Sequence, residues 1–383
     1  MQLRNRFWQD ILSKKMLVCI FTGFSSGLPL YILISLLPAW LKSYQLDLKA
    51  IGLFALIQLP YTWKFLWAPF FDRFSWVMGR RRGWLFFFQI LLLISIPLLG
   101  FYNPETEIMM VIVISTLIAF LSASQDVVID AYRRELLLDK ELGLGNAIHV
   151  NAYKIASLIP GSLSLILADH MNWQTVFIIT SLFMLPGLLL TFLMKEPKVL
   201  KIKKQDLTTS LFLPFQEFIN RHGLKSAFTI LLFIFFYKLG DSMATALATP
   251  FYLDLGFSKT EIGLIAKNAG LWPSVIGGLL GGIWMMKLGI NRALWLFGFL
   301  QMISILGFAG LAHIGYSPEW LALIVGFEAF GVGLGTTAFV AFIAKTTHPL
   351  YTATQFALFT SLAAIPRTLV NASTGYQIGR AHV

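Results

Sequence analysis

Apolar residues occur along the chain in long runs, and polar residues gather in short segments between them. Runs of about 18 or more apolar residues recur over the whole length, each long enough to cross a hydrocarbon core of roughly 30 Å. The pattern predicts eleven membrane-spanning helices. They lie near residues 16–41, 49–71, 83–102, 107–131, 143–168, 174–194, 226–253, 261–286, 293–314, 320–344 and 355–376.

A polar, basic stretch between the sixth and seventh predicted spans divides the chain. It contains KEPKVLKIKKQDL, which cannot lie in hydrocarbon. We therefore expect an N-terminal six-helix bundle over residues 1–195, a cytoplasmic linker over 196–225 and a C-terminal bundle over 226–377. A faint internal repeat favours a duplicated unit, because DLKAIGLFAL (47–56) and SKTEIGLIAK (258–267) open the second and eighth spans.

The last six residues, IGRAHV, match one reading frame of a common sequencing adapter. We therefore expect residues 378–383 to be a non-native tail and the natural chain to continue past about Gln377, with at least twelve spans. On this hypothesis the C-terminal bundle is incomplete here. The alternative is a short natural tail, and a genuine stop codon after Val383 in the resequenced locus would establish it.

Composition agrees with a membrane protein. Of 383 residues, 57% are hydrophobic and 13% are charged, about half the charged share of a soluble domain. The single cysteine, Cys19, excludes a disulfide framework, and six scattered histidines show no metal-ligand spacing, so we expect no metal site. The first apolar run is too long for the core of a secretory signal.

The net charge of +11 follows from membrane topology. With the N-terminus in the cytoplasm, the cytoplasmic segments hold 21 Lys and Arg, whereas the outside segments hold only Lys42, Lys49 and Lys259. The predicted orientation therefore has a cytoplasmic N-terminus. Because this asymmetry accounts for most of the positive charge, we expect no nucleic-acid partner.

Eight ionisable residues fall inside predicted spans. They are Lys64, Asp126, Lys154, Lys238, Asp241, Lys267, Glu328 and Arg367. Facing lipid at mid-bilayer, eight unpaired charges would cost roughly 20–28 kcal/mol, so they must pair or line a water-filled cavity. Two alternatives stay open: Lys238 and Asp241 can form a pair within one helix, and Lys64 can extend towards the headgroups.

The segment FLSASQDVVIDAYRREL (120–136) places two acids one helical turn apart. Asp130 has local partners in Arg133 and Arg134, at spacings of three and four. Asp126 lies a turn deeper, so its partner must come from another helix, with Lys154 and Lys64 as candidates. Burial and a neighbouring carboxylate favour uptake of a proton, which would couple a proton gradient to movement. The alternative is a static structural ion pair.

The loop WAPFFDRFSWVMGRRRGW follows the second span. Asp72 and Arg73 end a helix, and a glycine and three arginines follow. Asp72 can pair with the loop arginines or face the N-terminus of a neighbouring helix, where the helix dipole favours negative charge. This arrangement predicts a cytoplasmic gate formed by Asp72, Arg73 and Asp130.

This loop resembles a stretched form of the signature between helices two and three of the major facilitator superfamily. More specifically, the chain resembles the AmpG family of bacterial anhydromuropeptide permeases over nearly its full length. The matching stretches are FSSGLPL (24–30), KFLWAPFFDR (64–73), GRRRGW (79–84), SASQDVVIDAYR (122–133), YKLGD (237–241), GVGLGTTAFVAF (331–342) and ATQFALF (353–359). Span five departs from the family, with Lys154 in place of an arginine, which keeps the charge but loses the bidentate fork.

The resemblance implies an all-α polytopic protein with the major facilitator fold, two six-helix bundles with about eleven spans present. It implies a monomeric transporter in the bacterial inner membrane that imports N-acetylglucosaminyl-anhydro-N-acetylmuramyl peptides for cell-wall recycling. Transport would depend on the proton motive force and use no organic cofactor or ATP. Glycines in GVGLG would permit close helix approach.

The charged residues suggest roles in such a transporter. Five cations against three acids inside the spans favour an anionic solute, because Lys and Arg hold carboxylates well. Candidate substrate ligands are Lys64, Lys154, Lys238, Lys267, Arg367 and Gln125, and candidate proton-coupling acids are Asp126, Asp241 and Glu328. The alternatives are a transporter of another anionic solute, such as acetyl-CoA or a drug, and a membrane-embedded enzyme. The short outside loops hold no catalytic constellation, so we expect no enzyme activity.

Overall fold

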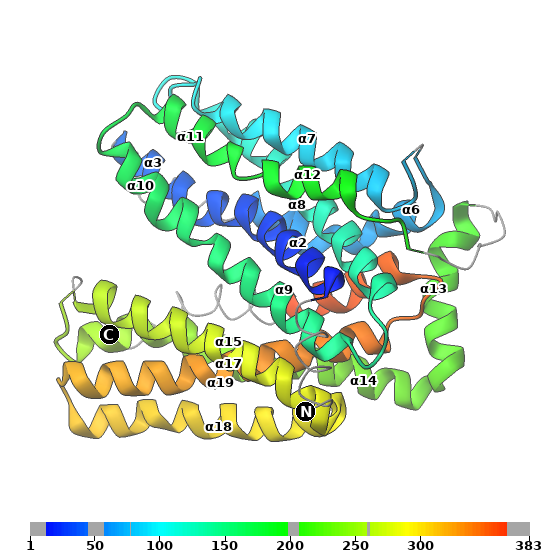
Figure 1. Cartoon of the computed structure of the whole chain (residues 1–383). Helices are drawn as coiled ribbons and strands as arrows, with labels where there is room; N and C mark the ends of the chain where they lie inside the picture. Colours follow the sequence, from blue (N-terminus) through cyan, green and yellow to red (C-terminus); the bar gives the residue numbers. More distant parts are fainter. Residues whose placement is uncertain (1–12, 45–56, 77, 198–206, 259–260, 366–383) are drawn as a thin grey trace. The chain divides into compact units, whose positions relative to one another are not determined.

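The computed structural model describes residues 13–44, 57–76, 78–197, 207–258 and 261–365, and this part of the chain contains helices and no β-strand (Figure 1). The predicted all-α fold class is therefore confirmed. Eight described helical stretches are long and apolar enough to cross a membrane. They are Lys14–Ser43, Arg82–Leu99, Ile108–Leu136, Leu142–Ala168, Trp173–Leu193, Asn268–Leu288, Ile290–Ile314 and Pro318–Thr346. The predicted spans 49–71 and 355–376 lie partly outside the described residues.

The chain divides into two compact units. Unit 1 comprises Met1–Leu138, Ile148–Pro214 and Thr347–Leu358, and unit 2 comprises Asp139–Ala147, Phe215–Thr346 and Phe359–Val383. The segment Thr347–Leu358 thus belongs to the unit formed by the first half of the sequence. The predicted limits at 195, 225 and 377 stay a prediction.

Unit 1 is built around helix α7. In chain order its elements are α2 (Lys14–Tyr31), η1 (Ile32–Leu36), α3 (Leu37–Ser43), α5 (Leu59–Trp63), η3 (Lys64–Leu66), α6 (Ala68–Arg73), α7 (Arg82–Leu99), α8 (Ile108–Leu136), most of α9 (Leu142–Ala156), η4 (Ile159–Leu163), α10 (Ser164–Ala168), α11 (Trp173–Leu182) and α12 (Leu185–Leu193). Helices α8, α11 and α12 pack against α7. Fully buried Leu85, Leu92 and Ile96 of α7 lie in the resulting core.

Two prolines interrupt helices in unit 1. Pro29 precedes the π-helical η1, and Pro160 lies inside the π-helical η4. Proline lacks the backbone donor that an α-helix needs and crowds the preceding turn, and a π-helical turn relieves that conflict. The predicted spans 16–41 and 143–168 are therefore each built from several joined helical segments.

Two glycines bring α2 close to α9. A Cβ at Gly23 would lie 2.3 Å from the carbonyl oxygen of His149, and one at Gly27 would lie 2.5 Å from that of Tyr153. Only glycine leaves room for this approach, and the four-residue spacing is typical of packed membrane helices. The approach fixes α2, which carries Ser25 and Ser26, beside α9.

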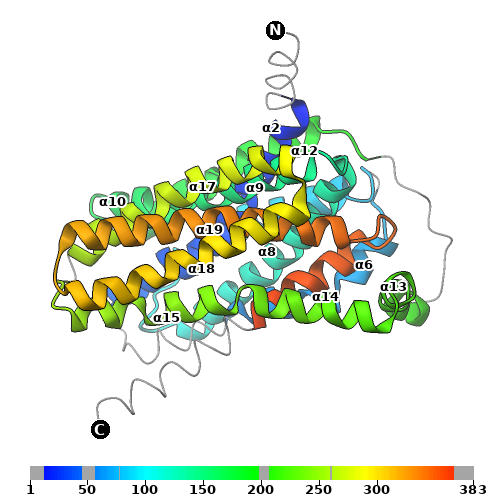
Figure 2. The ribbon, with the colours of Figure 1, turned by 90° about the horizontal axis from the view of Figure 1, so that it is seen from below.

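Unit 2 contains the longer helices of the second half. They are α14 (Leu224–Tyr237), α15 (Leu239–Asp254), η5 (Ile262–Ala266), α17 (Lys267–Leu288), α18 (Ile290–Ile314) and α19 (Pro318–Thr346), preceded by the second half of α13 (Leu207–His222). Helices α17, α18 and α19 lie side by side in both views (Figures 1 and 2). A Cβ at Gly333 of α19 would lie 2.2 Å from the carbonyl oxygen of Ser274, which confirms that the GVGLG glycines permit close approach.

Candidate functional site

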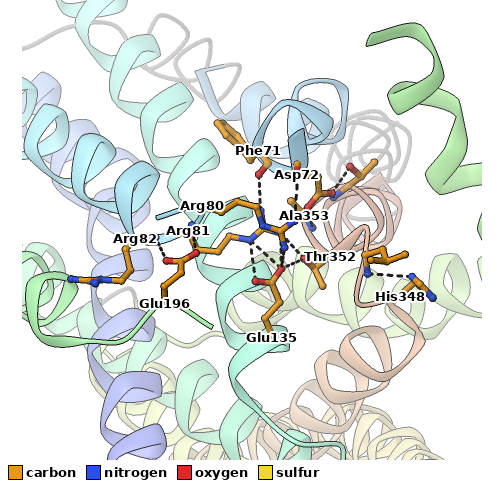
Figure 3. A network of polar contacts seen from close by, with 12 residues as sticks. Phe71, Asp72, Arg80, Arg81, Arg82, Glu135, Glu196, His348, Thr352 and Ala353 are labelled. Atoms are coloured by element: carbon orange, nitrogen blue, oxygen red, sulfur yellow. Dashed lines mark hydrogen bonds and ion pairs between the residues drawn. The ribbon is translucent and has the colours of Figure 1, made fainter. Parts of the chain in front are cut away.

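A buried network of charges surrounds Asp72 at the end of α6 (Figure 3). We call Asp72, Arg80, Arg81, Glu135 and Thr352 to Thr354 the Asp72 cluster. The Oδ1 atom of Asp72 accepts hydrogen bonds from Arg81 Nη2 at 2.7 Å and from the backbone N–H of Ala353 at 3.1 Å. Its Oδ2 atom accepts from the backbone N–H and the hydroxyl of Thr354, at 2.9 and 2.8 Å. All four acceptor bonds stabilise the ionised carboxylate.

Two of these donors belong to a helix N-terminus. Ala353 and Thr354 open the helix Thr352–Ile365, whose first backbone N–H groups have no partner within the helix. Such an end attracts negative charge. The sequence predicted that Asp72 would pair with a loop arginine or face a helix N-terminus, and the structure confirms both interactions.

Arg81 lies at the centre of the cluster and is fully buried. Its guanidinium donates to Glu135 Oε1 at 2.6 Å, to the carbonyl oxygen of Phe71 at 2.9 Å and to Thr352 Oγ1 at 2.6 Å. Burial by itself lowers the pKa of Arg81, but the carboxylates of Glu135 and Asp72 outweigh burial and raise that pKa above its ordinary value. The guanidinium is therefore permanently charged, and it holds α6, α8 and the start of Thr352–Ile365 together.

Glu135 also forms an ion pair with a second arginine, Arg80. Arg80 Nη2 lies 2.7 Å from Glu135 Oε1, and the Glu135 side chain is 3% exposed. Two guanidinium and two carboxylate groups thus meet in this cluster and balance in charge. A buried pair of this kind is stable only when its hydrogen bonds are satisfied, as the many contacts of Arg81 achieve.

Glu196 connects the start of the predicted linker to the same loop. Its carboxylate accepts the backbone N–H groups of Arg81 and Arg82, at 2.8 and 3.1 Å. The Arg82 side chain donates back to the carbonyl oxygens of Thr191 and Phe192 at the end of α12, at 3.1 and 2.7 Å. These reciprocal bonds fix the loop to the end of the sixth span.

Replacing Gly79 by alanine is expected to lower the free energy of unfolding by about 1–3 kcal/mol. Gly79 has a φ angle of +119°, and an added Cβ would lie 2.6 Å from Glu196 Oε2. Denaturation of the purified protein in detergent measures the loss. Gly161→Ala is the control, since nothing lies within 4 Å of its Cβ position. Equal losses in the two variants would contradict a special backbone requirement at Gly79.

A second cluster lies on α8 and comprises Ser26, Lys64, Asp126, Asp130 and Arg133; we call it the Asp126 cluster. Ser26 Oγ donates to Asp126 Oδ1 at 2.5 Å. Arg133 Nη2 lies 2.7 Å from Asp130 Oδ1, and Lys64 Nζ lies 3.9 Å from Asp130 Oδ2. The predicted Asp130–Arg133 pair is thus confirmed.

The contacts of Asp126 differ from the prediction. We expected a cation from another helix as its partner, either Lys64 or Lys154. The hydrogen-bond donor described is the neutral hydroxyl of Ser26 on α2, and the ion pair of Lys64 is with Asp130. The charge of Lys64 also acts on Asp126, so the predicted electrostatic partnership holds without a direct ion pair. The physical reason is position: Asp126 faces α2, whereas Asp130, one turn further along α8, meets η3 and its lysine.

The remaining predicted residues of unit 1 occupy different surroundings. Gln125 is fully buried, and its Nε2 donates to the carbonyl oxygen of Ser25 at 2.9 Å. Lys154 lies half-buried on α9. Arg73 is exposed, and its guanidinium lies 5.4 Å from the centre of the Phe74 ring. The structure therefore does not bring the three predicted gate residues together, because Asp72 contacts Arg81 and Asp130 contacts Arg133.

Unit 2 contains the other predicted residues. Lys238, between α14 and α15, donates from Nζ to Thr336 Oγ1 of α19 at 2.7 Å. Glu328 of α19 is buried. The side chains of Asp241 and Lys267, and the whole of Arg367, lie outside the described residues. The possible Lys238–Asp241 pair therefore stays untested.

A cavity of about 690 Å³ opens in unit 2 between α14 and α18. Six of its fifteen lining residues are aromatic, among them Phe233, Phe236, Trp295 and Phe299. None of the predicted charged residues lines this cavity. The prediction that the charges inside the membrane converge on a hydrated path therefore stays a prediction.

Several contacts in the two clusters were not predicted, namely those of Ser26, Glu135, Glu196 and Thr352 to Thr354. Ser26 lies in FSSGLPL, and Ala353 and Thr354 open ATQFALF; both stretches carry the family resemblance. Thr352 directly precedes the second stretch. Their position in these stretches was the only sequence signal that could have marked these residues as candidates. The pairings themselves join residues 54 to 282 positions apart, so no local pattern shows them.

The helical fold, with buried charges on membrane-spanning helices, is that of a polytopic membrane protein, and the family match below makes it a transporter. Residues 19–370 match the Major Facilitator Superfamily. The Escherichia coli K12 protein named anhydromuropeptide permease is 38% identical, over 94% of this chain and 73% of its own length. An uncharacterized protein of Haemophilus influenzae is 50% identical, over 98% of this chain and 91% of its own length. The chain belongs to the AmpG family of the major facilitator superfamily.

Solved structures agree on the fold. The major facilitator transporter FucP in its outward conformation superposes with a TM-score of 0.70 at 13% identity, covering 97% of this chain and 94% of FucP. At that identity the similarity concerns the fold alone. Because the matched family and relatives are transporters, the prediction that this chain is not an enzyme is confirmed.

Proposed function

We propose that this transporter imports anhydromuropeptides, N-acetylglucosaminyl-anhydro-N-acetylmuramyl peptides, for cell-wall recycling. Its proposed location is the bacterial inner membrane, with the N-terminus in the cytoplasm, as a monomer. The similarity to the Escherichia coli anhydromuropeptide permease supports the substrate class. The excess of Lys and Arg in the predicted cytoplasmic segments supports the orientation.

The observation that carries the coupling proposal is the environment of Asp126. Its carboxyl group is buried in a membrane-spanning helix and bonded by the Ser26 hydroxyl, while Lys64 and Arg133 lie at Asp130. A serine hydroxyl can donate to a carboxylate or accept from a carboxylic acid, so the site accommodates both protonation states. We therefore propose Asp126 as the proton carrier, ahead of the other candidates, Asp241 and Glu328.

Five predicted cations are proposed as ligands for the carboxylates of the substrate peptide. The set is Lys64, Lys154, Lys238, Lys267 and Arg367, with Gln125 as a neutral ligand. Lys64 is the most informative member, because it is buried and its 3.9 Å distance to Asp130 is long for an ion pair. A substrate carboxylate could compete with Asp130 for Lys64. Substrate binding would then change the charge environment of Asp130, one helical turn from Asp126.

The Asp72 cluster is proposed as the cytoplasmic gate. The predicted gate was Asp72, Arg73 and Asp130, and the contacts now favour Asp72 with Arg81, which also binds Glu135. Helices α6 and α8 end at this cluster, and the helix Thr352–Ile365 begins there. Loss of these bonds would free the start of Thr352–Ile365 from α6 and α8.

The experiment is uptake of labelled anhydromuropeptide into inverted and right-side-out membrane vesicles that contain the protein. Uptake should require an imposed proton gradient and collapse with a protonophore. Unlabelled anhydromuropeptide should compete, whereas acetyl-CoA should not. Gradient-independent uptake would refute proton coupling, and competition by acetyl-CoA alone would indicate a different anionic solute.

A further inference from the structure

Helix α13 carries an apolar side that the described part of the chain leaves partly exposed. Phe212, Phe215 and Ile219 are 72%, 36% and 40% exposed. Their spacing of three and four residues places them on one face of the helix. Three large apolar side chains aligned in this way would be costly to leave in water.

A neighbouring side of the same helix packs against other segments of the chain. Phe218 is buried, with its ring centre 5.1 Å from that of Phe359, and Arg221 donates to the carbonyl oxygen of Thr346 at 2.8 Å. Gln216 and Asn220 are exposed on a third side. The apolar surface of α13 is therefore wider than the part that other helices cover. The remaining side of the helix is polar.

The position of α13 suggests what covers the rest. Gly223, with a φ angle of +76°, turns the chain sharply between α13 and α14. The two helices run crosswise to each other in both views (Figures 1 and 2). Leu224 and Phe228 begin the apolar helix α14 and are 73% and 65% exposed, as expected for side chains that face lipid. Helix α13 thus lies across the start of a helix that enters the bilayer.

We propose that α13 is an interfacial helix whose face of Phe212, Phe215 and Ile219 inserts into the headgroup region of the leaflet where α14 begins. Amphipathic helices of this kind lie in the membrane plane with their apolar face roughly 5–10 Å into the headgroup and acyl boundary. The exposed Lys225 complements anionic lipids at that level. The proposal depends on membrane insertion of the chain and not on the substrate.

Spin labels at single introduced cysteines test this placement. Phe212→Cys and Ile219→Cys are labelled separately in the otherwise complete chain, reconstituted in nanodiscs of phosphatidylethanolamine and phosphatidylglycerol. Cys19 is buried, and the unsubstituted chain gives its background signal. Asn220→Cys is the matched control on the polar side, and Phe228→Cys is the lipid-facing reference. Collisions with oxygen report lipid, and collisions with a water-soluble nickel chelate report solvent.

Labels at 212 and 219 should resemble the label at 228, with more oxygen than nickel collisions and a depth of roughly 5–10 Å below the phosphates. The label at 220 should show the reverse ratio. Nickel accessibility at both 212 and 219 equal to that at 220 would overturn the proposal and leave a protein partner as the occupant. Two labelled positions on one face ensure that misfolding of a single variant does not decide the outcome.

Discussion

Replacing Arg81 by alanine is expected to destabilise the protein by about 3–5 kcal/mol, the cost of removing one partner from a buried ion network. Arg81 is fully buried and donates to Asp72, Glu135, Phe71 and Thr352. Without it the carboxylates of Asp72 and Glu135 remain buried, and Arg80, which is paired with Glu135, cannot compensate both. Unfolding of the purified protein by heat or denaturant in detergent measures the change.

Arg81→Lys should recover only part of the loss. An ammonium group keeps the charge but lacks the planar fork that bonds several acceptors at once. Arg73→Ala is the matched control from the same loop, because Arg73 is exposed and stacks only on Phe74 among the contacts described, a contact of about 0.5–1 kcal/mol. Similar losses for Arg81→Ala and Arg73→Ala would show that the network does not stabilise the fold.

The contrast between Arg73 and Arg81 shows where sequence reasoning stops. Membrane spans follow from local composition, and the Asp130–Arg133 pair follows from helical spacing, so both could be predicted. The loop contains Arg73 and three consecutive arginines, and composition cannot say which one is buried. That choice depends on the fold, which places Asp72, Glu135 and the start of Thr352–Ile365 around Arg81.

The partner of Asp126 illustrates the same limit. Charge complementarity favoured a lysine, and two lysines were available in neighbouring spans. The packing of α2 against α9, made possible by Gly23 and Gly27, sets the position of the helix that carries Ser26. A contact over 100 residues that depends on glycine packing elsewhere has no local signature. Tertiary structure was needed to see that the donor is neutral.

Asp126→Asn is expected to abolish uptake driven by a proton gradient while retaining exchange of substrate across the membrane. Asparagine has nearly the same shape, and its carbonyl oxygen can accept the Ser26 hydrogen bond, so the packing of α2 and α8 should persist. An amide, however, neither binds nor releases a proton in the physiological range. The measurement compares gradient-driven uptake of labelled anhydromuropeptide with exchange in vesicles preloaded with unlabelled substrate.

Ser26→Ala is the control, since it removes the hydrogen bond but leaves a carboxyl group that can titrate. It should slow gradient-driven uptake without abolishing it, whereas Asp126→Asn should reduce uptake to the level seen with a protonophore. Loss of exchange as well as uptake in Asp126→Asn would assign the residue to structure or substrate binding. Full gradient-driven uptake in that variant would transfer the coupling role to Asp241 or Glu328, because a neutral residue 126 could not then be the proton carrier.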